Sequence, residues 1–386
     1  MKKFKNKLKE STTSQPVLKY AGLAAVAVIG VGSMAALTGI NADTSAGNTQ
    51  AGFTANCGYG DSSVVASIGN RKSSDSTQIS IPAPSGDGWL SIDSHEVTNA
   101  QFERFVKATG YKTIAEKPWS GIDPATGTKL SSPPGSAVFI QPKGVADAAF
   151  SQWWAFIEGA DWRHPTGTDS DLANKQHYPV VQLTLADAEA YAEWAGRRLL
   201  TATEWEHAAR YNEDSTRQVW HRDESKPTGD STHWLANTWQ GIFPLRDNAG
   251  DGFEGIAPVG CYEPLASGLY DMIGNVWEWV QPQGDEQVAR RLPVIAASVN
   301  DQTPAELSNR AASATPEGAV AGAPNGNFHG EVNSPTSSRI MGGSYLCSAS
   351  FCMNYHPGAY YYQDATLGTN HIGFRTVADI PAPNES

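Results

Sequence analysis

Apolar residues recur at helical spacing in the segment Asn99–Gly110. Phe102, Phe105 and Val106 fall on one face of a helix, since side chains three or four positions apart lie side by side there. A glycine at position 110 is typical of the residue just past a helix C-terminus, because glycine adopts the left-handed conformation without steric cost. The segment therefore predicts one amphipathic helix that ends at Gly110.

Two further helices are predicted in the middle of the chain. Residues 185–195 (LADAEAYAEWA) predict a helix that Gly196 closes. Residues 203–210 begin with Thr203 and Glu206, which form the T-x-x-E pattern of a capping box. We therefore expect this helix to start at Thr203.

The longest apolar run lies near the N-terminus. Residues Ala21–Ile40 carry no charge, and 20 residues at about 1.5 Å each just span a hydrocarbon layer of roughly 30 Å. Lysines precede the run, which predicts a cytoplasmic N-terminus and export of everything after Ile40. The run is either an uncleaved anchor or a signal peptide cut near Ala42 or Ala46, and its length favours the anchor. We expect a periplasmic or otherwise extracytoplasmic protein, anchored to the inner membrane by residues 21–40.

The remaining pattern divides the chain into a linker and one domain. Residues 1–42 form the lysine-rich stub with the hydrophobic segment, and residues 43–85 are rich in Ser, Gly, Asn and Thr, which predicts a flexible linker with at most one strand. Residues 86–380 contain scattered aromatics and predict one irregular domain. Within it, residues 281–336 have few aromatics and predict a long surface excursion.

Composition narrows the class of protein. The chain has 386 residues with 28 Lys and Arg against 40 Asp and Glu, a net charge of −12. Six of the lysines lie in the first 20 residues, so the rest is more acidic still, which argues against a nucleic-acid partner. The 37 Gly, 23 Pro and 12 Trp residues indicate a loop-rich fold, and four Cys are too few for a disulfide scaffold.

The cysteines are the first candidate chemistry. Cys347 and Cys352 lie in MGGSYLCSASFC with four residues between them. Two thiolates cannot complete a tetrahedral zinc site, but they suit low-coordinate Cu(I). A plain disulfide also fits an exported protein, and the spacing alone favours it. Cys57 and Cys261 are isolated in different contexts.

Oxygen ligands are the second candidate. Asn237, Asp251, Asp271 and Glu278 lie in loop-rich sequence where backbone carbonyls are abundant, which suits Ca²⁺, although solvated acidic loops are the simpler interpretation. The nine histidines form no HExxH or H-x3-H pair, and the chain contains no G-x-S-x-G, P-loop or G-x-G-x-x-G motif. Hydrolase and nucleotide chemistry therefore find no support.

Taken together, the motifs resemble the formylglycine-generating enzyme (sulfatase-modifying factor) family. The resemblance covers about residues 86–378, in matching order and spacing; it rests on EVTNAQFERFVKATGY, YPVVQLTLADAEAYAEWAGRRLLTATEWEHAAR, NTWQGIFP, GLYDMIGNVWEW, GGSYLCSASFC and NHIGFR. It implies an α+β class: a single irregular, loop-rich domain whose core is remotely like that of C-type lectins, behind the N-terminal anchor or signal.

The family pattern GGSxxCxxSxC places functional residues on this chain. It implies that Cys347 and Cys352 hold a redox-active Cu(I) and that Ser344 is catalytic beside O2, with Ser350 also in register. The family's two structural calcium sites match as well. They imply one site from Asn237, Thr238 (backbone), Asp251 and Phe253 (backbone), and a second from Asp271, Gly274 (backbone), Val276 (backbone) and Glu278.

The implied reaction is the copper-dependent oxidation, by O2, of a cysteine in an unfolded sulfatase-type C-x-P-x-R segment to Cα-formylglycine. The partners are then such a cysteine-containing peptide and O2, with a membrane tether if the N-terminal segment stays uncleaved. Two alternatives remain. One is an oxidase of the same fold that acts on another peptide or a siderophore-like substrate, and the other is a non-catalytic, membrane-tethered recognition or assembly module.

The chain departs from the family at several positions. His356 and Tyr360 occupy two arginine positions near the cysteines, so both are candidates for a changed substrate groove. The family acid before the V-F segment is missing, and Thr376 replaces a closing cysteine. Cys57 and Cys261 then remain as a spare pair, for which an export-compartment disulfide is predicted.

Overall fold

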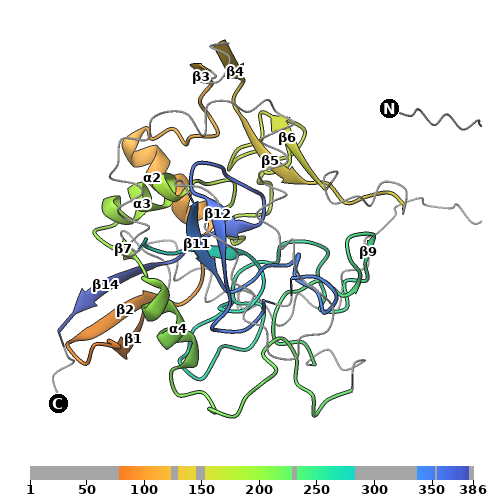
Figure 1. The fold of residues 1–386 in the computed structure, drawn as a ribbon. Coiled ribbons are helices and arrows are strands. Elements are labelled where there is room, and N and C mark those ends of the chain that lie inside the picture. Colours follow the sequence, from red (N-terminus) through yellow and green to blue (C-terminus); the bar gives the residue numbers. More distant parts are fainter. Residues whose placement is uncertain are drawn as a thin grey trace, which may run out of the picture. The chain divides into compact units, whose positions relative to one another are not determined.

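Two four-stranded sheets run through the part of the chain that the computed structural model describes, residues 78–122, 129–144, 153–227, 233–282, 337–352 and 354–381. The first sheet has the order β1-β2-β14-β7, and its neighbours are antiparallel. In it β2 pairs with β14, the last described strand, so residues 285 to 291 positions apart lie side by side (Figure 1). Its strands are β1 (Gln78–Pro82), β2 (Trp89–Asp93), β14 (Thr376–Ile380) and β7 (Arg198–Leu199).

The second sheet adjoins the segment with the candidate cysteines. Its order is β12-β11-β10-β13, with β10 parallel to β13 and the other pairs antiparallel. The segment that connects β11 to β12 contains both candidate cysteines. The strands are β10 (Trp277–Trp279), β11 (Ser337–Met341), β12 (Tyr360–Asp364) and β13 (Ile372–Gly373).

Three two-stranded ribbons complete the described strands. β5 pairs with β6 and brings Phe139 opposite Trp154, two aromatics that recur in the candidate site. The ribbons are β3 (Trp119–Ile122) with β4 (Lys129–Ser132), β5 (Gly135–Phe139) with β6 (Trp154–Glu158), and β8 (Gly241–Ile242) with β9 (Arg246–Asp247).

Three helices are described, and each begins with a capping box. α2 (Asn99–Thr109) ends at Gly110 in the left-handed conformation, and α3 (Leu185–Trp194) covers the second predicted segment, so both predictions are confirmed. The predicted start of α4 (Ala202–Arg210) is wrong by two residues. The cap is Thr201, whose side chain accepts the Glu204 N–H. A β-bridge between Thr201 and Gln281 keeps the chain extended at Thr201, two residues before the predicted cap.

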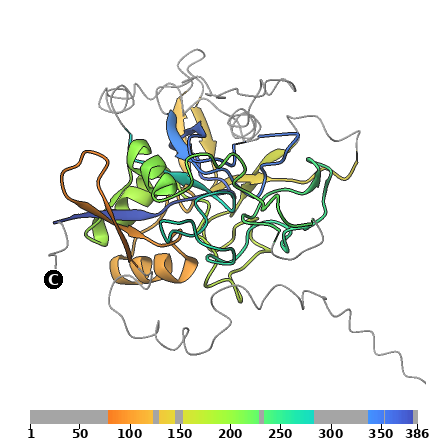
Figure 2. The same cartoon turned by 90° about the horizontal axis from the view of Figure 1, so that it is seen from below.

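Two hydrophobic clusters place the helices. In the first, Phe102 and Phe105 of α2 meet Tyr191 of α3, with ring centroids 5.9 Å and 5.7 Å apart, over a core that includes the second sheet and both candidate cysteines. In the second, Trp205 and its neighbours on α4 pack against the first sheet, and the α4 ribbon lies beside this sheet in Figures 1 and 2. The cysteines are therefore held by the same core that orders α2 and α3.

The described architecture confirms an α+β, loop-rich fold with few helices. It starts earlier than residue 86, since β1 lies in the segment predicted to be linker, where at most one strand was expected. The predicted anchor, residues 21–40, and most of the predicted excursion, residues 283–336, lie outside the described residues. Among the residues that are described, no helix is both long and apolar enough to cross a membrane.

Candidate active site

Two glycines turn the chain from β11 into the cysteine segment. Gly342 and Gly343 have φ of +95° and +83°, a region that other residues rarely adopt. A Cβ on Gly343 would lie 2.9 Å from the Asn354 carbonyl oxygen and 3.5 Å from Cys347 Sγ. Only glycine lets the backbone pass this close to the thiol, so the Gly-Gly turn positions the cysteines.

Cys347 and Cys352 are brought together as free thiols. Both are buried, and neither is in a disulfide. Burial, followed by a hydrogen bond to Cys347 and its charge, raises the pKa of Cys352 well above its usual value. Cys352 also has a left-handed φ of +59°, a costly conformation that folds retain mainly at functional sites. Adjacent soft sulfur donors without a disulfide fit a Cu(I) ion.

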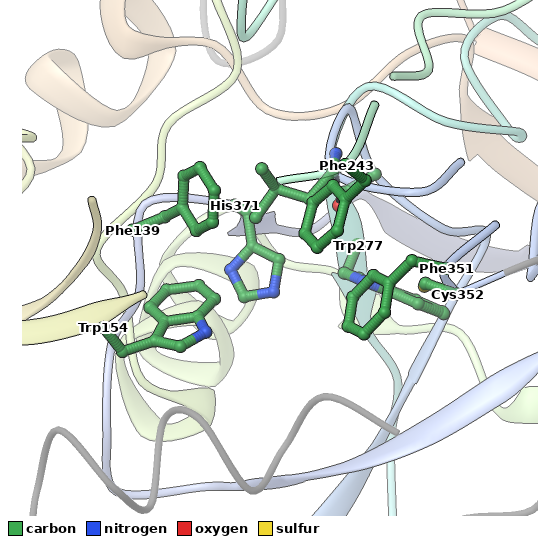
Figure 3. A pocket seen from close by; sticks show the side chains of 9 residues that line it. Phe139, Trp154, Phe243, Trp277, Phe351, Cys352 and His371 are labelled. Carbon is green, nitrogen blue, oxygen red and sulfur yellow. Dashed lines mark hydrogen bonds between the residues drawn. The ribbon is translucent and has the colours of Figure 1, made fainter. Parts of the chain in front are cut away.

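Cys352 and Ser344 open onto a small aromatic pocket (Figure 3). The pocket has a volume of about 10 Å³, which is room for about one water-sized molecule. It is lined by Phe139, Trp154, Phe243, Trp277, Ser344, Leu346, Phe351, Cys352 and His371. A dry pocket of this size beside a thiol fits a small diatomic or monatomic ligand.

Backbone contacts hold this segment in place. Ser344 is fully buried, its carbonyl accepts the Cys347 N–H at 2.9 Å, and its hydroxyl oxygen accepts the Leu346 N–H at 3.2 Å. The Cys347 carbonyl in turn accepts the Trp239 N–H at 2.9 Å. Ser344 is thus the residue that both shapes the cysteine turn and presents a hydroxyl to the pocket.

His356 and Tyr360 lie together, but in a second pocket. This pocket is polar, has a volume of about 420 Å³, and shares no lining residue with the aromatic one. Glu206 and Arg210 of α4 face it together with Arg339. Burial and the charge of Arg210 lower the pKa of His356, so this imidazole is neutral at pH 7.

The first predicted calcium set converges in space. Asp251 is fully buried, and its carboxylate accepts the N–H groups of Thr238 at 2.8 Å and Phe253 at 3.1 Å. Burial raises the pKa of Asp251 to about 7. The side-chain NH2 group of Gln240 donates to both Asp251 Oδ2 and the Thr238 carbonyl oxygen. These two oxygens are of the kind that binds Ca²⁺, and here they share a hydrogen-bond donor. Asn237, the fourth member, hydrogen-bonds Asn275 at 3.0 Å.

The second predicted set is only partly assembled. Glu278 is occupied by Arg375, whose guanidinium donates to both carboxylate oxygens at 2.7–3.0 Å, and by the Trp205 indole at 2.9 Å. The carboxylate beside Asp271 is instead Glu96, which is fully buried. Burial and then the charge of Asp271 raise the pKa of Glu96 well above its usual value.

Gly274, a member of the second set, lies against the backbone of Asn237, a member of the first set. Its φ is +79°, and a Cβ there would lie within 2.2 Å of the Asn237 carbonyl oxygen. Val276 directly precedes β10 and is buried. No group of three or more His, Cys, Asp or Glu side chains with metal-binding geometry occurs in the described ranges, so each set depends on backbone and amide oxygens.

A family model described as the sulfatase-modifying factor enzyme 1-like domain matches residues 61–380. The chain belongs to the sulfatase-modifying factor family. The match spans the two sheets, the cysteine segment and both acidic sets, and it begins before the residue at which the sequence resemblance was placed.

Several curated relatives carry the name formylglycine-generating enzyme, while others are named inactive C-alpha-formylglycine-generating enzyme 2 and hercynine oxygenase. The chain is 40% identical over 297 residues to the formylglycine-generating enzyme of Mycobacterium tuberculosis, and the aligned part covers 75% of this chain and 87% of that protein. It is 34% identical over 289 residues to the formylglycine-generating enzyme of Streptomyces coelicolor, covering 75% and 77%. The enzyme of the same name from Thermomonospora curvata is 36% identical over 291 residues, covering 75% and 81%. The chain is an enzyme of this family.

The structure gives physical reasons for two departures from the family pattern. At Gly135, one of the two positions where the family acid is missing, a Cβ would lie 2.5 Å from the Ile157 carbonyl oxygen, so no larger side chain fits there. Thr376 is buried, and its hydroxyl bonds Asp93 and Arg197. A polar network thus takes the place of a disulfide at that corner.

The second cysteine pair is seen in part. Cys261 is disulfide-bonded and belongs to a small buried cluster with Phe253 and Tyr262. Cys57, its predicted partner, lies outside the described residues, so the pairing of Cys57 with Cys261 stays a prediction.

Two buried residues of the site escaped the sequence reasoning. Glu96 is 175 positions from Asp271, and His371 lies 19 positions after Cys352, so neither shares a local motif with the residue that it meets. The only sequence signal for Glu96 is its place at the head of the EVTNAQ segment, and His371 had none beyond adjacency to IGFR. Tertiary packing alone reveals both.

Proposed function

We propose that this protein is an O2-dependent oxidase that converts a cysteine of a C-x-P-x-R peptide segment to Cα-formylglycine, with Cu(I) held by Cys347 and Cys352. The observation that carries this proposal is the pair of free, adjacent thiols at the edge of a pocket for one small molecule. The names of the relatives support the same reaction. When bound, copper supplies the oxidising chemistry, in which a C–H bond of the substrate is broken.

The chain's own residues have distinct parts in this scheme. Cys347 and Cys352 would hold the copper ion through their two sulfur atoms. The aromatic rings around Cys352 exclude water, which protects a reactive site from side reactions. Ser344 presents its hydroxyl beside the thiol, where O2 has room.

The test is direct. The full-length reduced protein, loaded with one equivalent of Cu(I), is incubated in air with a C-x-P-x-R peptide, and mass spectrometry follows conversion of the thiol to an aldehyde. Conversion that requires copper and oxygen supports the proposal. Tight Cu(I) binding without conversion refutes the substrate, and absence of Cu(I) binding refutes the chemistry and leaves a non-catalytic recognition module.

A second substrate class is favoured by the polar pocket at His356 and Tyr360. Two arginines line this pocket, and the position of the family acid is closed at Gly135, so a substrate arginine lacks that partner. The alternative function is oxidation of another cysteine-containing peptide or a siderophore-like molecule. A matched peptide pair decides between them: preference for C-x-P-x-E over C-x-P-x-R supports the alternative.

Two calcium ions are proposed as structural cofactors. The Asp251 set fits a cation because its carboxylate and carbonyl oxygens lie close together in a buried place. The groups that contact these oxygens are N–H donors of Thr238 and Gln240. The second set fits through Asp271 and Glu96, whose Oε2 accepts no hydrogen bond from the residues described. Glu278 lies near these two carboxylates. Its oxygens already accept hydrogen bonds from Arg375.

We also propose that the enzyme acts outside the cytoplasm. The support is the uncharged run of residues 21–40 behind a lysine-rich start, together with the disulfide at Cys261, since disulfides persist in oxidising compartments. Fractionation of cells that express the full chain tests this: recovery in the membrane fraction supports the inner-membrane anchor, and recovery as a shortened soluble protein supports a cleaved signal.

A further inference from the structure

The aromatic pocket contains an imidazole that the scheme above does not use. His371 lies directly before β13, is 4% exposed, and lines the pocket together with Cys352 and Ser344. Figure 3 shows its ring in the middle of the labelled side chains, and its centroid is 4.8 Å from that of Trp154. The question is what the ring presents to a small ligand in this pocket.

The backbone around His371 is tightly fixed. The His371 carbonyl accepts the Trp277 N–H at 2.9 Å, and the Thr369 carbonyl accepts the Gln182 N–H at 3.0 Å. Between them, the Asn370 side chain accepts the Phe139 N–H at 2.9 Å. These contacts fix the backbone that carries the ring to three separate segments of the chain.

The tautomer of the ring follows from its neighbour. Nδ1 of His371 lies 2.8 Å from the hydroxyl oxygen of Thr369, which is fully buried. Burial lowers the pKa of His371 to about 3, so at neutral pH the ring carries a single N–H. In the described part of the chain the Thr369 hydroxyl has no other acceptor, and it therefore donates to Nδ1. The single proton of the ring then lies on Nε2.

This Nε2–H has no acceptor among the residues that the structure describes. Among the described residues, His371 and the two cysteines do not form a three-ligand group. The donor faces the space where the proposed function places O2, and a preorganised donor is most useful where negative charge develops during a reaction.

We propose that His371 is a catalytic residue whose Nε2–H donates a hydrogen bond to the dioxygen-derived oxygen atoms in the pocket beside Cys352. The inference rests on the proposed function. It assigns the pocket two donors, the Ser344 hydroxyl and the His371 imidazole, and it makes Thr369 the residue that sets the donor tautomer.

The kinetic test compares two variants at this position in the copper-loaded full chain. His371→Phe keeps a flat ring but removes the donor, and we expect kcat/KM for O2 to fall by on the order of 10²-fold. His371→Gln retains an N–H and should recover most of that loss. Copper affinity and the KM for the peptide should stay at the wild-type value in both. An unchanged kcat/KM for O2 in folded His371→Phe would overturn the proposal.

A second test needs no turnover. In the reduced, copper-free full chain with ¹⁵N-labelled histidine, NMR should show His371 as the Nε2–H tautomer. Sodium bromide, a monatomic acceptor, should shift that resonance relative to sodium gluconate at equal ionic strength, and Thr369→Val should weaken the tautomer preference. An Nδ1–H tautomer, or no response to bromide, refutes the donor. Failure of the peptide assay with this donor present would count against the proposed function alone.

Discussion

The cysteine pocket and the acidic cluster around Glu278 are buried to a similar degree, but their polar groups are satisfied in different ways. Glu278 is 1% exposed, and Arg375 and Trp205 donate to its two oxygens. Cys352 is 6% exposed, and its thiol meets the Cys347 thiol, Asn354 and the edge of a pocket. Buried groups with complete partners stabilise a fold, whereas buried groups left facing a cavity are candidates for chemistry.

The acidic cluster itself contains the same contrast on a smaller scale. The guanidinium of Arg375 neutralises Glu278, while Glu96 and Asp271 repel each other, and burial raises the pKa of Asp271 to about 6. A buried carboxylate pair of this kind lowers its charge by holding a proton or by binding a cation. The first half of the cluster therefore holds the core together, and the second half is where the proposed calcium ion would bind.

The largest expected effect is on turnover. Cys347→Ser and Cys352→Ser should each lower peptide conversion by about a thousandfold or more, since each removes a sulfur ligand of copper. The melting temperature should change by only a few degrees. Ala349→Ser, at an exposed position between the cysteines, is the matched control and should keep wild-type turnover. Conversion retained by either cysteine variant would place the chemistry elsewhere.

The next effect is on stability. Arg375→Met leaves Glu278 as an uncompensated buried charge, and we expect a loss of about 3–5 kcal/mol in the free energy of unfolding. Arg198→Met is the control, because Arg198 pairs with Glu204 and Asp379 near the surface and should contribute only about 0–1 kcal/mol. Urea denaturation measures both. Equal losses would show that burial does not distinguish the two ion pairs.

Calcium removal should have an intermediate effect that depends on pH. Asp251 and Asp271 have folded-state pKa values of about 7 and 6, above those of an unfolded chain. The calcium-free folded protein then binds more protons than the unfolded chain between about pH 4 and 7, so its stability falls as the pH rises through this window. Calcium replaces those protons and stabilises more at about pH 7.5 than at about pH 5.

Melting curves with calcium or with a chelator at the two pH values test this prediction. Asp251→Asn should reduce the calcium effect, because it removes the charge of the first set. Identical melting temperatures with and without calcium at the higher pH would contradict the assignment of both acidic sets.

The smallest effect separates two competing capping patterns. Thr201→Ala removes the observed cap of α4 and should cost about 1 kcal/mol. Thr203→Ala changes the predicted cap, which is an exposed residue, and should change stability by less than about 0.5 kcal/mol. Chemical denaturation of the pair checks the order, and a larger loss in Thr203→Ala would restore the predicted helix start.

The same helix shows how far sequence reasoning extends. Thr201 with Glu204 and Thr203 with Glu206 both satisfy T-x-x-E, so the local pattern offers two starts, and only the bridge to Gln281 selects one. α2 and α3 were predictable because their caps and apolar faces are local. The family motif located Cys347, Cys352 and Ser344 for a similar reason, since all three lie within nine residues.

The rest of the site depends on contacts between distant residues. Glu96 reaches Asn275 across 179 positions, and no periodicity or spacing connects them. The engagement of Glu278 by Arg375 and the placement of His371 in the aromatic pocket are likewise properties of the second sheet, whose strands come from separate parts of the chain. Such residues become visible only when the sheet order is known.

The most direct test of the central claim is a Cu(I) competition titration of the reduced full chain. The account predicts one tightly bound copper per chain, lost in Cys347→Ser and in Cys352→Ser and retained in Asp251→Asn. Copper that stays bound in both cysteine variants, or a wild-type protein that binds none, would contradict the assignment of the thiol pair as the reactive centre.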